Sequence, residues 1–200
     1  MMATTHALVG FVLGAVAMAF GLPAHLAVPA AVLGSVVPDL DLYYGHRRTL
    51  HYPIGFPLAA VGSGTLAILA GGSLALVLAT VVLFAAAVHV GLDVLGGGLE
   101  LRPWEGTSDR AVYDHVRGRW IPPRRWVPYD GSPEDLAVAG VLTTFAAPFY
   151  DGVWLTLMLV LVGISFVYVA LRRRLAAYAP AVVGRLPQTV RERVPGRYVE

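Results

Sequence analysis

The feature that most limits how this chain can fold is the stretch between His51 and His89, which contains no charged residue. One membrane-crossing helix needs about 20 apolar residues, so this stretch is too long for one crossing but has the length of two. A Gly-Gly pair divides it into two apolar segments, 54–70 and 73–92. Only 14% of all residues are charged, against about 25% in a typical soluble domain. The sequence therefore predicts a polytopic α-helical membrane protein.

Four more apolar segments extend this pattern to an all-α bundle of about six transmembrane helices. They are residues 7–20, 24–37, 136–150 and 153–171. In the first segment, Gly10, Gly14 and Ala17 recur at a spacing of three to four residues, which is typical of closely packed membrane helices. Near the fifth segment, Ser132 and Pro133 followed by two acidic residues predict the start of a helix.

Residues 99–135 form a long polar stretch with six Arg, seven acidic residues and three of the four Trp. Its five prolines disfavour long helices, although a short helix is predicted at 108–117. We expect this lobe to lie at the level of the lipid headgroups. Arg172, Arg173 and Arg174 are expected to end the last span. The predicted organisation is therefore a membrane-embedded domain, 1–174, and a basic tail, 175–200, which lies on an anionic membrane surface or is disordered.

A polar island at residues 38–51 interrupts the apolar pattern, and ionisable residues beside hydrocarbon commonly mark a function. If the segments alternate across a membrane, seven Asp and His residues fall at one membrane face: His6, Asp39, Asp41, His46, His51, His89 and Asp93. Such a set can bind one Zn²⁺, or a pair of Zn²⁺, Mn²⁺ or Fe²⁺ ions. Each residue taken alone could instead be a helix cap, a loop residue or an interfacial polar residue. The absence of cysteine excludes thiolate ligands.

Taken in order, these motifs resemble the YdjM-like family of membrane-bound, metal-dependent hydrolases, also described as LexA-binding inner-membrane hydrolases. The matching motifs are Thr5-His6, Pro38-Asp39-Leu40-Asp41, His46-Arg47 to His51, and His89 to Asp93, followed by a Gly-rich turn. Residues 1–105 carry the resemblance. Leu50 and Tyr52 stand where the family often has Thr and Ser around the histidine.

The family is distantly similar to zinc-dependent phospholipase C and the zinc-dependent single-strand nucleases, which implies site roles for individual residues here. The metal ligands implied are His6, Asp39, His51, His89 and Asp93. Asp41 and His46 are implied as ligands, as residues that support ligands or as proton-transfer groups. Arg47, with Arg48 beside it, is suited to bind phosphate oxygens in a forked geometry. We therefore predict catalytic roles for Asp41, His46 and Arg47.

The leading functional hypothesis is an integral membrane hydrolase with a divalent metal, most consistent with Zn²⁺, that cleaves a phosphoester of a lipid or a lipid-linked substrate. The alternative is a non-enzymatic scaffold or regulator that metal stabilises and that binds a soluble partner through residues 99–135. A transporter is less favoured because the charged residues lie at helix ends rather than at mid-membrane. The mixed charge of the lobe argues against a nucleic-acid partner.

The distribution of Arg predicts a plasma-membrane (bacterial inner-membrane) protein with both termini and the polar site in the cytoplasm. All 15 basic residues are Arg, and none lies in the three turns expected on the opposite side. Because short basic loops remain cytoplasmic, reporter proteins fused at Gly106 and at the C-terminus should both give cytoplasmic signals. Opposite signals from the two fusions would exclude six spans, and an external signal at Gly106 would reverse the placement of the site.

Overall fold

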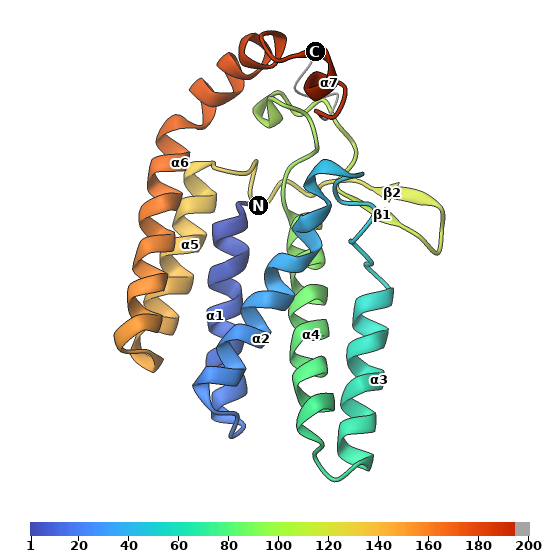
Figure 1. Ribbon diagram of the computed structural model, residues 1–200, viewed down its shortest axis with the longest axis vertical. Coiled ribbons are helices and arrows are strands. Elements are labelled where there is room, and N and C mark those ends of the chain that lie inside the picture. Colours follow the sequence, from blue (N-terminus) through green and yellow to red (C-terminus); the bar gives the residue numbers. More distant parts are fainter. Residues whose placement is uncertain (195–200) are drawn as a thin grey trace.

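The computed structural model describes residues 1–194. Its long helices run side by side, and the connecting segments 37–54 and 96–132 lie together at one end, here called the head (Figure 1). The long helices are α1 (Ala3–Ala19), α2 (Ala24–Val36), α3 (Gly55–Leu69), α4 (Leu74–Leu95), α5 (Pro133–Ala146) and α6 (Gly152–Gly184). The short elements are η1 (Val37–Tyr43), η2 (Pro103–Glu105), β1 (Val112–Asp114), β2 (Arg119–Ile121), η3 (Ala147–Phe149) and α7 (Gln188–Arg191). The predicted, mostly helical architecture is thus confirmed.

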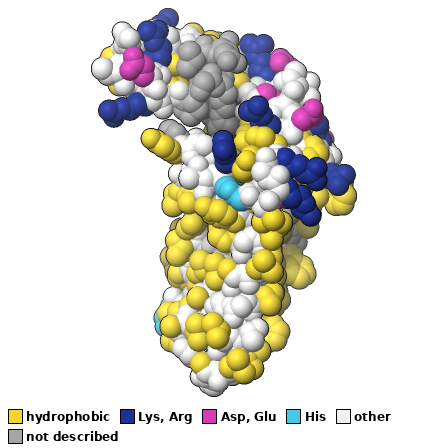
Figure 2. Space-filling view, turned by 90° about the vertical axis from the view of Figure 1, so that its right-hand side faces the viewer, with side chains coloured by type: hydrophobic (Ala, Val, Ile, Leu, Met, Phe, Trp, Pro, Cys, Tyr) yellow, Lys and Arg dark blue, Asp and Glu magenta, His cyan; other side chains and the backbone are white. Residues whose placement is uncertain are grey.

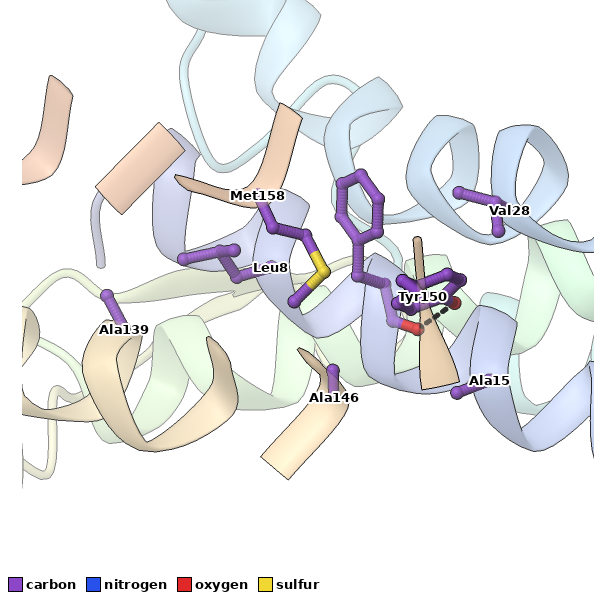
Figure 3. Packing of buried hydrophobic residues seen from close by; sticks show 8 residues of the cluster. Leu8, Ala15, Val28, Ala139, Ala146, Tyr150 and Met158 are labelled. Carbon is purple, nitrogen blue, oxygen red and sulfur yellow. Dashed lines mark hydrogen bonds between the residues drawn. The ribbon is translucent and has the colours of Figure 1, made fainter. Parts of the chain in front are cut away.

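Helix α1 lies at the centre of the packing and contacts α2, α4, α5 and α6, while α4 also contacts α3. Leu8 and Phe11 of α1 belong to a buried apolar cluster that includes Val28 of α2 and Met158 of α6 (Figure 3). The hydroxyl of Tyr150, from the connection between α5 and α6, donates a 2.6 Å hydrogen bond to the Phe11 carbonyl. The N-terminal helix therefore joins the α2–α4 side of the bundle to the α5–α6 side.

Three helical stretches of the described chain are long and apolar enough to cross a membrane, rather than the six predicted. They are Ala24–Leu42, Leu74–Leu95 and Gly152–Gly184. Helices α1 and α3 are apolar but have only 17 and 15 residues. At about 1.5 Å per residue, both are shorter than the roughly 30 Å hydrocarbon layer. Gly21 and Gly71 adopt positive φ angles of 92° and 65° at the turns that end them.

The polar lobe contains a small β-hairpin where a short helix was predicted. Strand β1 pairs antiparallel with β2, and Tyr113 lies opposite Trp120 with their ring centroids 5.4 Å apart. The prediction of a helix at 108–117 was wrong because the cross-strand pair of Tyr113 and Trp120 stabilises a hairpin instead. The Tyr113 amide also donates to the Arg47 carbonyl, at 3.0 Å, which ties the hairpin to the polar island.

Helix α6 does not end at the Arg172–Arg174 triplet, as had been expected, but continues to Gly184. Arg172 turns inward, where its guanidinium lies 3.1 Å from both carboxylate oxygens of Asp130. It also lies over the ring of Trp104. Arginine is a good helix former, so a paired arginine gives the helix no reason to stop. Residues 175–194 therefore begin as helix, and the end of the predicted tail, 195–200, lies outside the described residues.

Glycine allows the backbones of α1, α2 and α4 to approach closely, as the small residues of the first segment predicted. A Cβ atom at Gly10 would lie 2.7 Å from Cα of Val32 in α2. One at Gly34 would collide with the Val82 carbonyl of α4. The close contact between α2 and α4 is important for the candidate site described below, because residues of this site lie at the ends of both helices.

Gly10→Ala should lower the free energy of unfolding by about 1–3 kcal/mol, because the added methyl overpacks a backbone contact. Gly163→Ala in α6 is the matched control, since nothing lies within 4 Å of a Cβ at that position. Thermal unfolding of both variants in the same detergent, followed by circular dichroism, measures the difference. Equal midpoints for the two variants would contradict the close α1–α2 packing.

Candidate metal centre

Four ionisable side chains from three parts of the chain converge at the head of the bundle. Asp39 comes from η1, His51 from the loop before α3, and His89 and Asp93 from the last turns of α4. Each offers one nitrogen or oxygen, and these four atoms all lie within 4.8 Å of one another. The i, i+4 spacing places His89 and Asp93 on one face of α4, while the turn after α2 brings Asp39 to the same place.

The separations of these atoms are close to the edges of a metal-coordination tetrahedron. Ligand atoms at about 2.0–2.2 Å from a tetrahedral Zn²⁺ stand roughly 3.3–3.6 Å apart. The Nε2 atoms of His51 and His89 lie 3.3 Å apart, and Asp93 Oδ2 lies 3.2 Å and 3.4 Å from them. Asp39 Oδ1 lies 3.5 Å from His89 Nε2 and 4.0 Å from His51 Nε2. Three ligands thus have tetrahedral spacing, and Asp39 stands slightly farther out.

The hydrogen bonds on the far side of both imidazoles leave their inner nitrogens free to bind a cation. His89 Nδ1 lies 2.7 Å from the carbonyl oxygen of Ser35, which can only accept, so Nδ1 must carry the proton. His51 Nδ1 lies 3.0 Å from Asp41 Oδ2 and donates in the same way. In the neutral rings, both Nε2 atoms therefore present lone pairs to each other and to two carboxylates. A metal ion is the partner that satisfies all four atoms together.

Asp41 organises the loop that carries His51. Its carboxylate accepts hydrogen bonds from the amides of Arg47, at 3.2 Å, and Leu50, at 3.1 Å, in addition to that from His51. Its Oδ1 atom also lies 3.0 Å from His46 Nδ1. Asp41 and His46 were both predicted as site residues. Asp41 contacts the candidate ligand His51, and His46 contacts Asp41, so both lie outside the group of four candidate ligands.

Burial lowers the pKa of His51, but its hydrogen bonds to Asp41 and Asp93 and the negative charges of these two carboxylates together raise the pKa above its ordinary value. The cause is the negative charge gathered around the ring. In the absence of metal, this charge attracts a proton, so the same surroundings that favour a divalent cation also favour an imidazolium. Metal and protons therefore compete for this histidine.

The second oxygen of Asp93 is held by a separate set of polar groups. Asp93 Oδ1 lies 3.2 Å from His6 Nε2, 3.0 Å from Arg47 Nη2 and 3.1 Å from the amino group of Met1. The ring of His6 stacks on that of His89 with centroids 3.7 Å apart. Four of the five predicted ligands therefore come together, whereas His6 touches the opposite side of Asp93 and its role as a ligand stays a prediction.

Arg47 is buried, although it was predicted to bind phosphate. Its guanidinium contacts Asp93 and donates a 2.9 Å hydrogen bond to the carbonyl of Gly97. In this arrangement it neutralises and orients the Asp93 carboxylate. Phosphate binding by Arg47 would require it to exchange these contacts, whereas its neighbour Arg48 is exposed.

Three of the four candidate ligands are buried, and only Asp39 is partly exposed to solvent. The side chains of His51, His89 and Asp93 are at most 1% exposed, whereas that of Asp39 is 19% exposed. Leu40 and Tyr44, which lie close to Asp39 in the sequence, are strongly exposed apolar side chains.

Sequence reasoning missed two supports of the site. The Ser35 carbonyl that orients His89 is a backbone group, and no residue type signals it. Asp135 had been interpreted as an acidic residue in the first turn of a helix, and it does lie there. Its carboxylate, however, also accepts from the Met2 amide and the Thr5 hydroxyl, both at 2.7 Å. It thereby fixes the start of α1, next to His6.

No family model matches the chain, and neither the curated proteins nor the solved structures contain a match.

Purified protein should contain a tightly bound first-row divalent ion, and His89→Ala or Asp93→Ala should remove most of it because each deletes a ligand. Asp41→Asn should weaken binding less, by about 10–100-fold, because it only loosens the orientation of His51. Elemental analysis after purification without chelator measures the occupancy. His25→Ala, an exposed histidine in the distant first turn of α2, is the control and should keep its metal. Metal-free wild-type protein would contradict the site.

Proposed function

We propose that this protein is an integral membrane, metal-dependent hydrolase that cleaves a phosphoester, as its resemblance to the YdjM-like hydrolases implies. The observation that carries the proposal is the convergence of four acceptor atoms, three of them buried, with the fourth ligand at the solvent boundary. Catalytic metal sites typically hold the ion with three protein ligands and leave one position for water or substrate. His51, His89 and Asp93 would hold the ion, and Asp39, at the solvent boundary, would be the ligand nearest to water or substrate.

The donor set of two imidazoles and two carboxylates suits Zn²⁺ best, with Mn²⁺ and Fe²⁺ as the other candidates. Such an ion supplies acidity, because it lowers the pKa of bound water to about 7, and it stabilises charge on phosphate oxygens. Arg47 keeps Asp93 ionised and oriented through its 3.0 Å contact. Asp41 holds His51 in the tautomer whose Nε2 faces the centre.

His46 is the candidate for proton transfer near the opening. Its Nδ1 atom contacts Asp41, and its side chain is 16% exposed, so that the ring lies between the buried centre and solvent. A histidine between a buried centre and solvent is a common general acid or base. Asp41 then has two tasks, since its two oxygens contact His46 and His51.

The apolar trunk below the site supports placement in the plasma membrane with the head at the cytoplasmic surface. Hydrophobic side chains cover the trunk in the view of Figure 2, while Arg side chains gather on the head. A site at this boundary is suited to a substrate with an apolar tail and a phosphate group, which is a phospholipid or a lipid-linked phosphate. We expect the exposed side chains of Leu40 and Tyr44 to contact this tail.

A metal-stabilised scaffold is the second candidate, and one observation favours it. Asp39 completes a set of four protein ligands, and closed sites of this kind are typical of structural zinc. The two proposals differ in what Asp39 does: in the hydrolase it yields a position to substrate, and in the scaffold it stays bound. Loss of Asp39 should therefore affect them differently.

Purified protein should hydrolyse phosphoesters in a panel that contains short-chain phospholipids, and a chelator should abolish turnover until metal is restored. Asp93→Ala should reduce kcat/KM at least about 10³-fold because it removes a metal ligand. Asp39→Asn should keep a measurable part of the bound metal and change the rate. Wild-type protein that retains its metal but turns over no substrate of the panel would favour the scaffold and overturn the hydrolase.

A further inference from the structure

The β1–β2 hairpin projects sideways from the head, above the start of α3 (Figure 1). His115, at the end of β1, stacks on Tyr52 with ring centroids 4.6 Å apart, and its Nε2 lies 2.6 Å from the Arg48 carbonyl. Tyr52 in turn packs edge-on against Phe56, in the first turn of α3. Leu58 and Val61 follow on α3 and are about two-thirds exposed. The hairpin is thus attached to the start of α3 through the rings of His115, Tyr52 and Phe56.

Several arginines lie on or beside this hairpin, and three of them have no acidic partner among the described residues. Arg48 lies over the Tyr113 ring at 4.6 Å, and Arg110 lies over the Trp120 ring at 5.7 Å. Arg119 is exposed at the start of β2. Within residues 1–194, no carboxylate lies within 4.0 Å of these three guanidinium groups. Arg117 differs, because it pairs with the buried Asp114 at 2.9 Å.

These features are typical of a protein surface that binds anionic lipids. Tyrosine and tryptophan rings favour the interface between hydrocarbon and water. A guanidinium held over such a ring keeps donors free that match a phosphate in forked geometry. Arginines near an anionic leaflet are each attracted to it. The level of the hairpin, its rings and its unpaired cations therefore favour the same partner.

We propose that the β1–β2 hairpin is an anionic-lipid-binding arm, which docks on phosphate headgroups beside the metal centre through Arg48, Arg110 and Arg119. A hydrogen bond and an ion pair connect the hairpin with the candidate metal centre. The Tyr113 amide binds the Arg47 carbonyl at 3.0 Å, and the Arg47 side chain holds Asp93. The arm therefore orients the head on its leaflet and steadies the loop that supports the site. It rests on the proposed membrane placement and does not require hydrolysis.

Because the chain has no native cysteine, a single spin label can report on the arm. Val116→Cys places the label at the exposed hairpin turn, and Val61→Cys places a second label, in a separate sample, on the lipid-facing side of α3. Both proteins are reconstituted into nanodiscs of phosphatidylcholine alone or with 30% phosphatidylglycerol. The label at 116 should become immobile and shielded from an aqueous nickel chelate only with phosphatidylglycerol. Added salt should reverse this change.

Arg110→Gln and Arg119→Gln should each lower the docked-to-free ratio of the 116 label about 5-fold, the effect of one arginine near an anionic surface. Arg117→Gln is the matched control on the same hairpin and should change the ratio less than 2-fold, because Asp114 already neutralises Arg117. The label at 61 should be shielded from the chelate in both lipid mixtures.

Several results would overturn the proposal that the hairpin is a lipid-binding arm. A 116 label that stays mobile in phosphatidylglycerol, or equal effects of all three Arg variants, would contradict specific docking. Immobilisation by soluble glycerol phosphate in phosphatidylcholine nanodiscs would show a site for free phosphate instead. A label at 61 open to the chelate would remove the membrane placement and the arm with it. Absent phosphoesterase activity together with normal docking would reject only the hydrolase.

Discussion

The head of this structure depends on the interactions of one buried carboxylate, that of Asp93. It is fully buried at the end of α4, where an ionised group is stable only if cations or donors surround it. One oxygen faces Arg47, His6 and the Met1 amino group, and the other faces His51 and His89. The N-terminal helix and the polar island therefore meet α4 at a single side chain.

The bundle below the head provides the rigidity that such a buried charge needs. Glycine in α1 and α2 brings these helices close to their neighbours, so that the ends of α2 and α4 have fixed relative positions. Asp39 and Ser35 then reach the site from the end of α2, and His89 and Asp93 reach it from α4. Asp135 holds the start of α1 through Thr5 and the Met2 amide. A metal held in this way would bind to ligands that are already in place.

The lobe between α4 and α5 packs against the ends of α4 and α6. The 124–127 segment caps the end of α4, since the amides of Arg124 and Val127 donate to the Val94 and Leu95 carbonyls. Arg172 joins the lobe to α6 through Asp130. These contacts explain why the lobe is folded although its prolines exclude long helices. They also give the proposed lipid-binding arm a fixed base, so docking would act on an ordered loop.

The sequence by itself determined the helical class, the positions of the long helices and the types of residue that form the site, because the length of the apolar segments and the local spacing of residues carry that information. His89 and Asp93 were predictable as a pair for the same reason. Only the tertiary structure decided that Asp39 and His51 join them while His6 lies behind, since these separations depend on how α1, α2 and α4 pack. It also decided the hairpin and the continuation of α6, where the Arg47 carbonyl and Asp130 supply partners from distant parts of the chain. Local propensity cannot contain such contacts, because their energy comes from residues that meet only after folding.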